Sequence, residues 1–359
     1  MNVNYIIQVH NEDPVGELRE FLADWWNQYS LDALMAPVEH PQSQTVAAQV
    51  ISDPAGLSQV NPFAPLLLSN AAREAVEFIE ARPGERLALL LRPCELRAFI
   101  ELHKRGRARS EVPVVLIGVD CLGTYPPDEY ARRVQMRSVA GVTREVLHDT
   151  TEGGLRPRSF RNACQVCDWP APRSADLTIG TIGVDSNHFL VLIARDEEVD
   201  ASLGLPSLID APASEYQVSH RETVVGAVAD LRAVARRKLL GELNAPCRFG
   251  DLGCLMAWFS GCDLCANCLA ACPVYEGELD GWLGRTGPDQ VSRAPLADLV
   301  AISRWLASCS GCGMCEEHCG NDVPLTLLIS SLSHRIRGEM KYTSGDANQD
   351  FPWVHQPHQ

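Results

Sequence analysis

Two runs of cysteine in the C-terminal part constrain this chain more than any other feature. Both runs have the spacing C-x2-C-x2-C-x3-C. Three thiolates at this spacing can bind three corners of one iron–sulfur cubane, and in two-cluster ferredoxins the fourth cysteine of each run binds the other cluster. The spacing therefore predicts two 4Fe-4S clusters, held by Cys262, Cys265, Cys268, Cys272, Cys309, Cys312, Cys315 and Cys319.

Each cluster should take three cysteines from one run and the last cysteine from the other. This crossed pattern assigns Cys262, Cys265, Cys268 and Cys319 to one cluster, and Cys309, Cys312, Cys315 and Cys272 to the other. A pair of zinc sites is the alternative. Zinc needs four ligands, commonly two Cys-x-x-Cys pairs, which leaves the extra regularly spaced cysteine without a role. Cys247 and Cys254 lie outside both runs and are candidates for buried structural thiols.

The segment between the two runs has helical periodicity over residues 296–306. Residues 245–335 thus resemble the α-helical ferredoxin module of heterodisulfide reductase small subunits and succinate dehydrogenase iron–sulfur subunits. The resemblance implies an all-α domain with two 4Fe-4S clusters. It departs from the usual pattern at Gly320, where proline commonly follows the last cysteine. Beyond the module, residues 341–359 form a polar tail, which we expect to be mobile unless a partner holds it.

Residues 1–240 read as an α/β domain with a central mixed or parallel sheet. Leu87–Leu91 is a short apolar run, Pro93 begins a helix to about Lys104, and residues 112–119 form a second apolar run. This order predicts a β-α-β unit with parallel strands. We expect further helices over residues 14–29, 70–79, 126–137 and 224–243, and further strands over residues 45–51, 177–184 and 189–195.

Four more cysteines occur in the α/β part. Cys94 stands where a strand meets a helix, and Cys121 ends the next strand, so both should lie at the carboxyl edge of the sheet. Cys164 and Cys167 come from a Gly- and Pro-rich loop long enough to reach that edge. Four thiolates suit one cubane, whereas each cysteine alone could be a buried apolar residue. The Cys164–Cys167 pair could equally be a redox dithiol or half of a zinc site.

The helix that opens at Cys94 has Arg92 and Arg97 beside it. Its first backbone N–H groups and the two guanidinium groups could bind a pyrophosphate. Alternatively, both arginines pair with Glu95, Glu101 or surface carboxylates. No Gly-x-Gly-x-x-Gly motif follows a strand, which disfavours a Rossmann dinucleotide site.

Several of these segments together resemble one family. They are the stretch from Arg92 to Ala98, the strand end from Ile117 to Cys121, and the Cys164–Asp168 loop followed by residues 175–180. Over residues 45–235 the chain is similar to the β subunits of coenzyme F420-reducing hydrogenase and F420-dependent formate dehydrogenase. The resemblance implies FAD and one 4Fe-4S cluster, with Cys94, Cys121, Cys164 and Cys167 as its ligands. By the same resemblance Asn61 and Asn70 lie near the flavin.

The resulting expectation is an iron–sulfur flavoprotein subunit with FAD and three 4Fe-4S clusters. Its partner would be the catalytic subunit of a hydrogenase, formate dehydrogenase or heterodisulfide reductase-like complex, with F420 or a nicotinamide as a possible two-electron carrier. A flavin-free relay protein is one alternative, and direct reduction of a small organic substrate is another. No residues here form a recognisable nickel, molybdenum or tungsten site.

Composition narrows the partners and the compartment. The formal net charge is −15 and the pI is near 5.1, which argues against nucleic acid as a partner because phosphate binding needs a basic face. No apolar stretch approaches the roughly 20 residues of a membrane span, and no signal peptide pattern opens the sequence. We therefore expect a cytoplasmic protein without a membrane span.

Overall fold

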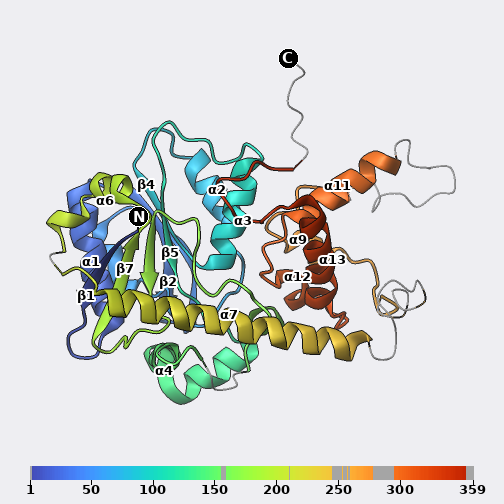
Figure 1. The fold of residues 1–359 in the computed structure, drawn as a ribbon, viewed down its shortest axis with the longest axis horizontal. Coiled ribbons are helices and arrows are strands. Elements are labelled where there is room, and N and C mark those ends of the chain that lie inside the picture. Colours follow the sequence, from blue (N-terminus) through green and yellow to red (C-terminus); the bar gives the residue numbers. More distant parts are fainter. Residues whose placement is uncertain are drawn as a thin grey trace.

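The computed structural model describes residues 2–154, 159–209, 211–244, 253, 257, 259–277 and 295–352. An α/β part and a smaller helical part lie side by side, and the long helix α7 (Glu215–Asn244) runs beneath the first toward the second (Figure 1). Cys247 and Cys254 lie outside the described residues.

A mixed seven-stranded sheet forms the core of the α/β part, with strand order β1-β7-β6-β5-β4-β2-β3. The four strands β2, β4, β5 and β6 run parallel, and β1, β3 and β7 pair antiparallel with their neighbours. The expectation of a mixed or parallel sheet is confirmed in its mixed form. The strands are β1 Val3–Gln8, β2 Ala33–His40, β3 Thr45–Ile51, β4 Leu87–Leu91, β5 Val115–Val119, β6 Leu177–Gly180 and β7 Phe189–Ala194.

Helices cover both faces of this sheet. Because successive strand residues point to opposite faces, Ala88 and Leu90 of β4 pack in the core on the side of α1 (Pro14–Tyr29), while Leu87, Leu89 and Leu91 pack against α2 and α3. All five residues of β4 are buried. The other helical elements of this part are α2 Ala72–Glu80, α3 Pro93–Lys104, α4 Pro127–Thr150, α5 Asn162–Gln165, α6 Glu197–Leu203, η1 Pro54–Gln59 and η2 Leu205–Ser207.

The expected β-α-β unit is present, with β4 and β5 paired in parallel and α3 between them in sequence. The other elements differ mainly in length. Helix α4 continues to Thr150 because the chain resumes its helical path after a break at Ser138, whose φ is 65°. The strand expected over residues 177–184 ends at Gly180, where the N–H groups of Thr181 and Ile182 donate instead to Asp120.

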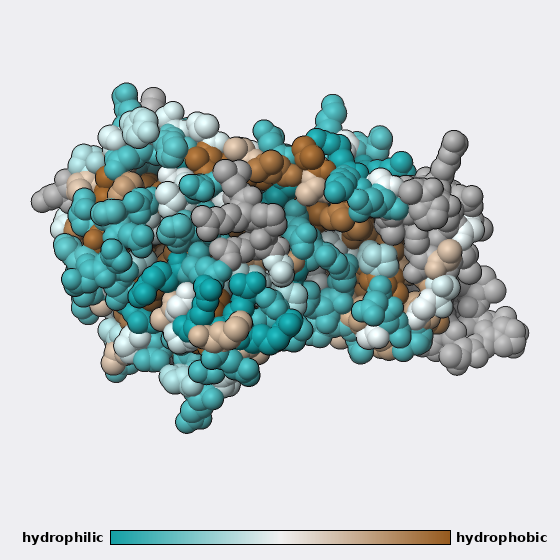
Figure 2. All heavy atoms as spheres, turned by 90° about the horizontal axis from the view of Figure 1, so that it is seen from below, coloured by the Kyte–Doolittle hydropathy of each residue, from teal (hydrophilic) through white to brown (hydrophobic). Residues whose placement is uncertain are grey.

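The described part of the C-terminal module contains helices and no strand. Helix α11 spans Pro295–Ala307 and packs against α13 (Leu325–Met340), and the short helices α9 (Asn267–Ala270) and α12 (Met314–Glu317) follow cysteine-containing turns. Among the described residues, no helix has both the length and the apolar character that a membrane span requires. On the face seen from below in Figure 1, hydrophilic side chains predominate and hydrophobic ones form smaller groups (Figure 2).

The first part of the polar tail is held by the chain itself. Tyr342, Ser344 and Phe351 are buried. Ser344 donates to the carbonyl of Ser308 in the module, and Phe351 lies under the guanidinium groups of Arg105 and Arg304. The expectation of a mobile tail is therefore wrong for residues 341–352, because the partner that holds them is the rest of this chain.

Candidate functional site

The four cysteines of the α/β part lie around the carboxyl ends of β4 and β5. Cys94 stands in the first turn of α3 after β4, and Cys121 follows β5 by two residues. Cys121 lies near enough to Cys94 to raise its thiol pKa. Cys164 and Cys167 raise the pKa of Cys121 in the same way. All four are free thiols, so the 164–167 pair is not closed as a disulfide. The structure thus brings together two strand ends and a loop that is distant in sequence.

Burial and nearby charges shift the pKa values of these thiols in different directions. Burial raises the pKa of Cys94 well above its usual value and that of Cys121 to about 11. At Cys164 burial acts in the same direction, but the Arg161 guanidinium and hydrogen bonds from Thr124 outweigh it and leave the pKa lowered. Thr124 N–H donates to Cys164 Sγ over 3.4 Å, and Arg161 Nη2 donates to it over 3.8 Å. A metal ligand has to be a thiolate, and the lowered pKa makes Cys164 easier to ionise than Cys94 or Cys121.

Helix α7 fixes the backbone that carries these cysteines. Arg232 donates to the carbonyls of Leu122 and Cys167, and Arg236 pairs with Asp168. Nearer its start, Arg221 forms a buried ion pair with Asp120 at 2.7 Å, directly before Cys121 in sequence. These contacts join β5 and the 164–168 loop to one rigid helix.

The C-terminal cysteines form two groups. Cys272 lines one largely apolar cavity together with Cys309, Cys312 and Cys315, the four residues that the crossed pattern assigns to one cluster, and Cys268 of the other assigned set lines it as well. Trp305 Nε1 donates to Cys272 Sγ over 3.4 Å, and burial raises the pKa of Cys272 to about 12. Bringing Cys272 beside the second run, more than thirty residues away, is what crossed ligation requires.

The other C-terminal group lies closer to solvent. Cys262 and Cys265 are exposed, and Leu264 between them is 77% exposed. Cys268 and Cys319 both pack against the small apolar cluster of Val323, Leu325 and Leu328, as does Cys315 from the group that includes Cys272. This group therefore includes the only two exposed thiols among the described cysteines.

The donor sets suit cubanes better than single ions. In the described part of the chain, no three His, Cys, Asp or Glu side chains stand close enough to share one metal ion. A zinc ion needs its thiolates within about 2.3 Å of one point, whereas a cubane takes one thiolate at each of four separate irons. Several thiols spread around one cavity, as at Cys272, fit the second arrangement.

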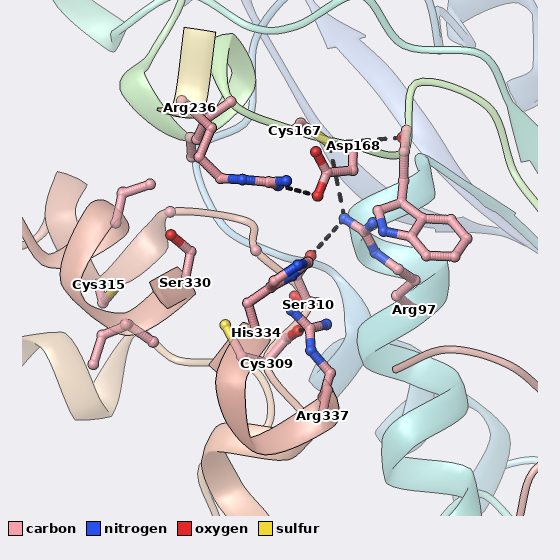
Figure 3. A pocket seen from close by; sticks show the side chains of 17 residues that line it. Arg97, Cys167, Asp168, Arg236, Cys309, Ser310, Cys315, Ser330, His334 and Arg337 are labelled. Carbon is pink, nitrogen blue, oxygen red and sulfur yellow. Dashed lines mark hydrogen bonds and ion pairs between the residues drawn. The ribbon is translucent and has the colours of Figure 1, made fainter. Parts of the chain in front are cut away.

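The α/β group and the Cys272 group meet at the contact between the two parts of the chain. Cys94 and Cys312 pack against the same small cluster as Leu67, and the charge of Cys312 acts on Cys94. Gly313 approaches Ala163 so closely that a Cβ atom at position 313 would overlap the Ala163 side chain. The pocket beside this contact is lined from both parts, by Cys167 and Arg97 on one side and by Cys309, Cys315 and helix α13 on the other (Figure 3).

The residues expected near a flavin are mostly engaged in internal contacts. The Asn61 amide donates to Glu39 and Thr143 and accepts from Ala64 N–H, and Asn70 caps α2 by accepting from Ala72 N–H. Both asparagine side chains thus take part in the internal structure, and their place near a flavin stays a prediction.

The two arginines differ from each other. Arg92 donates to the Ala64 carbonyl over 2.7 Å and lies 3.8 Å from Glu95, which is the ion-pair alternative to a pyrophosphate site. Arg97 does not pair with Glu101 and instead bridges Cys167 and Ser310. The role of Arg92 and Arg97 in binding a dinucleotide stays a prediction, as does that of Asn61 and Asn70.

Sequence reasoning missed three contributors to this site: Arg161, the α7 arginines and Trp169. Arg161 stands three residues before Cys164, a spacing that one helical turn converts into a contact. The roles of Arg232 and Arg236 depend on where α7 crosses the loop, which no local pattern reveals.

Comparison with known proteins gives two matching families. Residues 84–204 match the family model for the C terminus of the beta subunit of coenzyme F420 hydrogenase/dehydrogenase, and residues 261–324 match the model for a 4Fe-4S dicluster domain. The F420-dependent formate dehydrogenase subunit beta of Methanocaldococcus jannaschii is 22% identical over 298 residues, covering 74% of this chain and 75% of that protein.

Two further likenesses are more limited. The F420-dependent formate dehydrogenase 1 subunit beta of Methanococcus maripaludis is 30% identical over 121 residues, covering 28% of this chain and 30% of that protein. A chain of the F420-reducing [NiFe] hydrogenase complex of Methanosarcina barkeri superposes with a TM-score of 0.46 at 9% identity, over 68% of this chain and 92% of that chain.

Proposed function

We propose that this chain is the electron-transfer subunit of an F420-dependent formate dehydrogenase or hydrogenase complex, exchanging electrons between FAD and three 4Fe-4S clusters. The premise is that it joins an F420 hydrogenase/dehydrogenase beta-subunit domain to a 4Fe-4S dicluster domain, and that its relatives are oxidoreductase subunits. Residues 1–240 would form the first domain and residues 245–335 the second. The catalytic subunit would be another chain, with a heterodisulfide reductase-like enzyme as a further possible partner.

The observation that carries the proposal is that Cys94 packs against the buried cluster that contains Cys312. This packing joins the α/β cysteine group to the Cys272 group. When bound, 4Fe-4S clusters accept and release single electrons. The three cysteine groups then follow one order, from the α/β group through the Cys272 group to the exposed Cys262 group.

The chain's own residues support such a series by excluding water and holding the groups in place. Cys312 is buried, and Cys94 and Cys272 are largely shielded by Leu67 and Trp305. The α7 arginines fix the 164–168 loop, and the tail residue Ser344 binds the module next to Cys309. The first two groups are therefore insulated, while Cys262 and Cys265 face solvent, where a partner protein could approach.

FAD and its two-electron partner, F420 or a nicotinamide, rest on the family resemblance alone. A flavin would supply the conversion between hydride transfer and single electrons. Asn61, Asn70 and Arg92 make internal contacts and do not by themselves identify a flavin site, and a relay without flavin is the alternative. For this reason the cofactor has to be identified chemically.

The test is anaerobic purification from the native cell with the partner subunits retained, followed by metal, flavin and subunit analysis. About twelve iron atoms per chain are expected from three cubanes, together with one FAD. About eight iron atoms would remove the α/β cluster, and stoichiometric zinc would revive the zinc sites. Absence of flavin from an iron-replete complex would leave the relay alternative, and co-purification of a formate- or hydrogen-oxidising subunit would identify the complex.

A further inference from the structure

Two buried arginines, Arg97 and Arg161, lie where the α/β cysteine group meets the Cys272 group. Arg97 is 7% exposed and Arg161 is 3% exposed. Arg97 Nη2 lies 3.9 Å from Cys167 Sγ and donates to the Ser310 carbonyl over 2.5 Å, so it touches both cysteine-bearing loops. Figure 3 shows its guanidinium between these two partners.

Arg161 contacts another thiol of the α/β cysteine group. Its Nε donates to Thr124 Oγ1 over 2.8 Å and its Nη2 to Cys164 Sγ over 3.8 Å. Burial lowers the pKa of Arg161, and four neighbouring groups, Cys164, Cys94, Glu317 and Cys312, raise it. Three of these four are thiols from the two cysteine groups.

Neither arginine forms an ion pair with a carboxylate in the described part of the chain. Arg97 Nε and Arg161 Nη1 are also buried there without a hydrogen-bond acceptor. Other buried arginines are paired, as Arg221 is with Asp120 and Arg92 with Glu95. A buried guanidinium without an anion is costly. This cost would be removed by an anion at the thiols themselves.

A cubane with four thiolate ligands is such an anion, and its negative charge grows by one when it is reduced. A fixed positive charge nearby therefore stabilises the reduced state more than the oxidised state, and the burial of both guanidinium groups weakens the screening of that effect. Arg173 offers a contrast, since it stacks on Trp169 near Arg97 but is exposed to solvent.

We propose that Arg97 and Arg161 form a cationic clamp that raises the reduction potentials of the two clusters at this junction. The clusters concerned are those of the Cys94 group and of the Cys272 group. The cluster of the exposed Cys262 group has neither arginine in contact within the described residues, and so keeps its own potential. The inference rests on the proposed function, because it requires clusters in these cysteine groups.

The test is a redox titration of the full chain, followed by electron paramagnetic resonance, for wild type, Arg97→Gln, Arg161→Gln and the matching lysine variants. Each glutamine variant should move two of the three reduction waves to lower potential, by about tenfold in the reduction equilibrium, which is about 59 mV for one electron. Arg97→Lys and Arg161→Lys keep the charge and should restore most of the wild-type potential. Arg173→Gln is the matched control and should leave all three waves in place.

The outcomes separate the clamp from the proposed function. Wild type without clusters would defeat the proposed function itself. Clusters present in the glutamine variants with unchanged potentials would overturn the clamp alone. If a glutamine variant loses iron, retention in the lysine variant supports the clamp, whereas loss from both variants shows a purely structural role and overturns it.

Discussion

Tyr342 donates its phenolic hydrogen to the buried carboxylate of Glu101, whose two oxygens lie 2.6 and 2.7 Å away. Lys104 Nζ donates to the same phenol over 2.9 Å, and Gly345 N–H donates to Glu101 over 2.8 Å. Glu101 belongs to α3, the helix that Cys94 opens. The C-terminal segment, residues 341–352, thus joins the α/β part to the module by bonds that no cysteine pattern predicts.

Removing the Tyr342 hydroxyl should loosen this C-terminal segment. In Tyr342→Phe the buried Glu101 loses a donor, and a hydrogen bond to a charged group contributes about 1.5–3 kcal/mol. We expect amide exchange at Gly345 to quicken by about tenfold or more. Tyr216→Phe is the control, because that side chain is 77% exposed. Equal exchange at Gly345 in both variants would contradict the role given to Tyr342.

The same contact should open at alkaline pH. Burial, and then the negative charge of Glu101, raise the pKa of Tyr342 above its usual value. Since the folded pKa exceeds the unfolded one, the contribution of Tyr342 is complete below about pH 10 and falls as the pH rises beyond it. Exchange at Gly345 should accelerate above that pH in wild type. The acceleration attributable to this group should be missing in Tyr342→Phe, and its persistence there would assign it to another group.

Local patterns predicted the centre of the fold better than its edges. Leu87–Leu91 and Pro93–Lys104 have the expected bounds because a buried parallel strand is uniformly apolar and Pro93 marks the start of a helix. Strand β2 was not predicted, since Pro37 interrupts its run. The end of β6 at Gly180 depends on Asp120, a partner sixty residues away, which local sequence cannot reveal.

For the site, the sequence identified the cysteines but not what surrounds them. Spacing alone pairs Cys272 with the second run, and the structure brings these residues around one cavity. The packing of Cys94 against the cluster that contains Cys312 and the bridge made by Arg97 arise only when two parts of the chain dock. Asn61 and Asn70 were chosen by resemblance, and their hydrogen bonds are internal ones.

Single serine substitutions in the module should interrupt the series of cysteine groups at different points. If Cys312 holds a cluster at the junction as proposed, Cys312→Ser should stop reduction of the exposed group by way of the α/β part. Cys262→Ser should spare the junction and affect only the exposed group. Each variant should lose up to about four iron atoms of twelve. Rapid-mixing spectroscopy of cluster reduction then shows which centres are still reduced. Neither variant should release FAD, and flavin loss from either folded protein would contradict the two-domain division.

The docking of the module depends on the absence of a side chain at residue 313. Gly313 has φ of 72°, and a Cβ atom there would overlap that of Ala163, next to Cys164. Gly313→Ala combines a left-handed backbone, costing about 1–2 kcal/mol, with overpacking of about 1–3 kcal/mol. The cysteines themselves are untouched, so the iron content should remain while the contact opens.

Gly320→Ala is the matched control, because a Cβ atom at that position meets no atom within 4 Å although it also follows a cysteine. Amide exchange across residues 161–167 should quicken in Gly313→Ala and stay at the wild-type rate in Gly320→Ala. Electron exchange between the α/β group and the module should slow in Gly313→Ala but not in Gly320→Ala. The reason is that separation of the two cysteine loops lengthens the path between Cys94 and Cys312. Equal behaviour of the two alanine variants would mean that the module does not dock through Gly313.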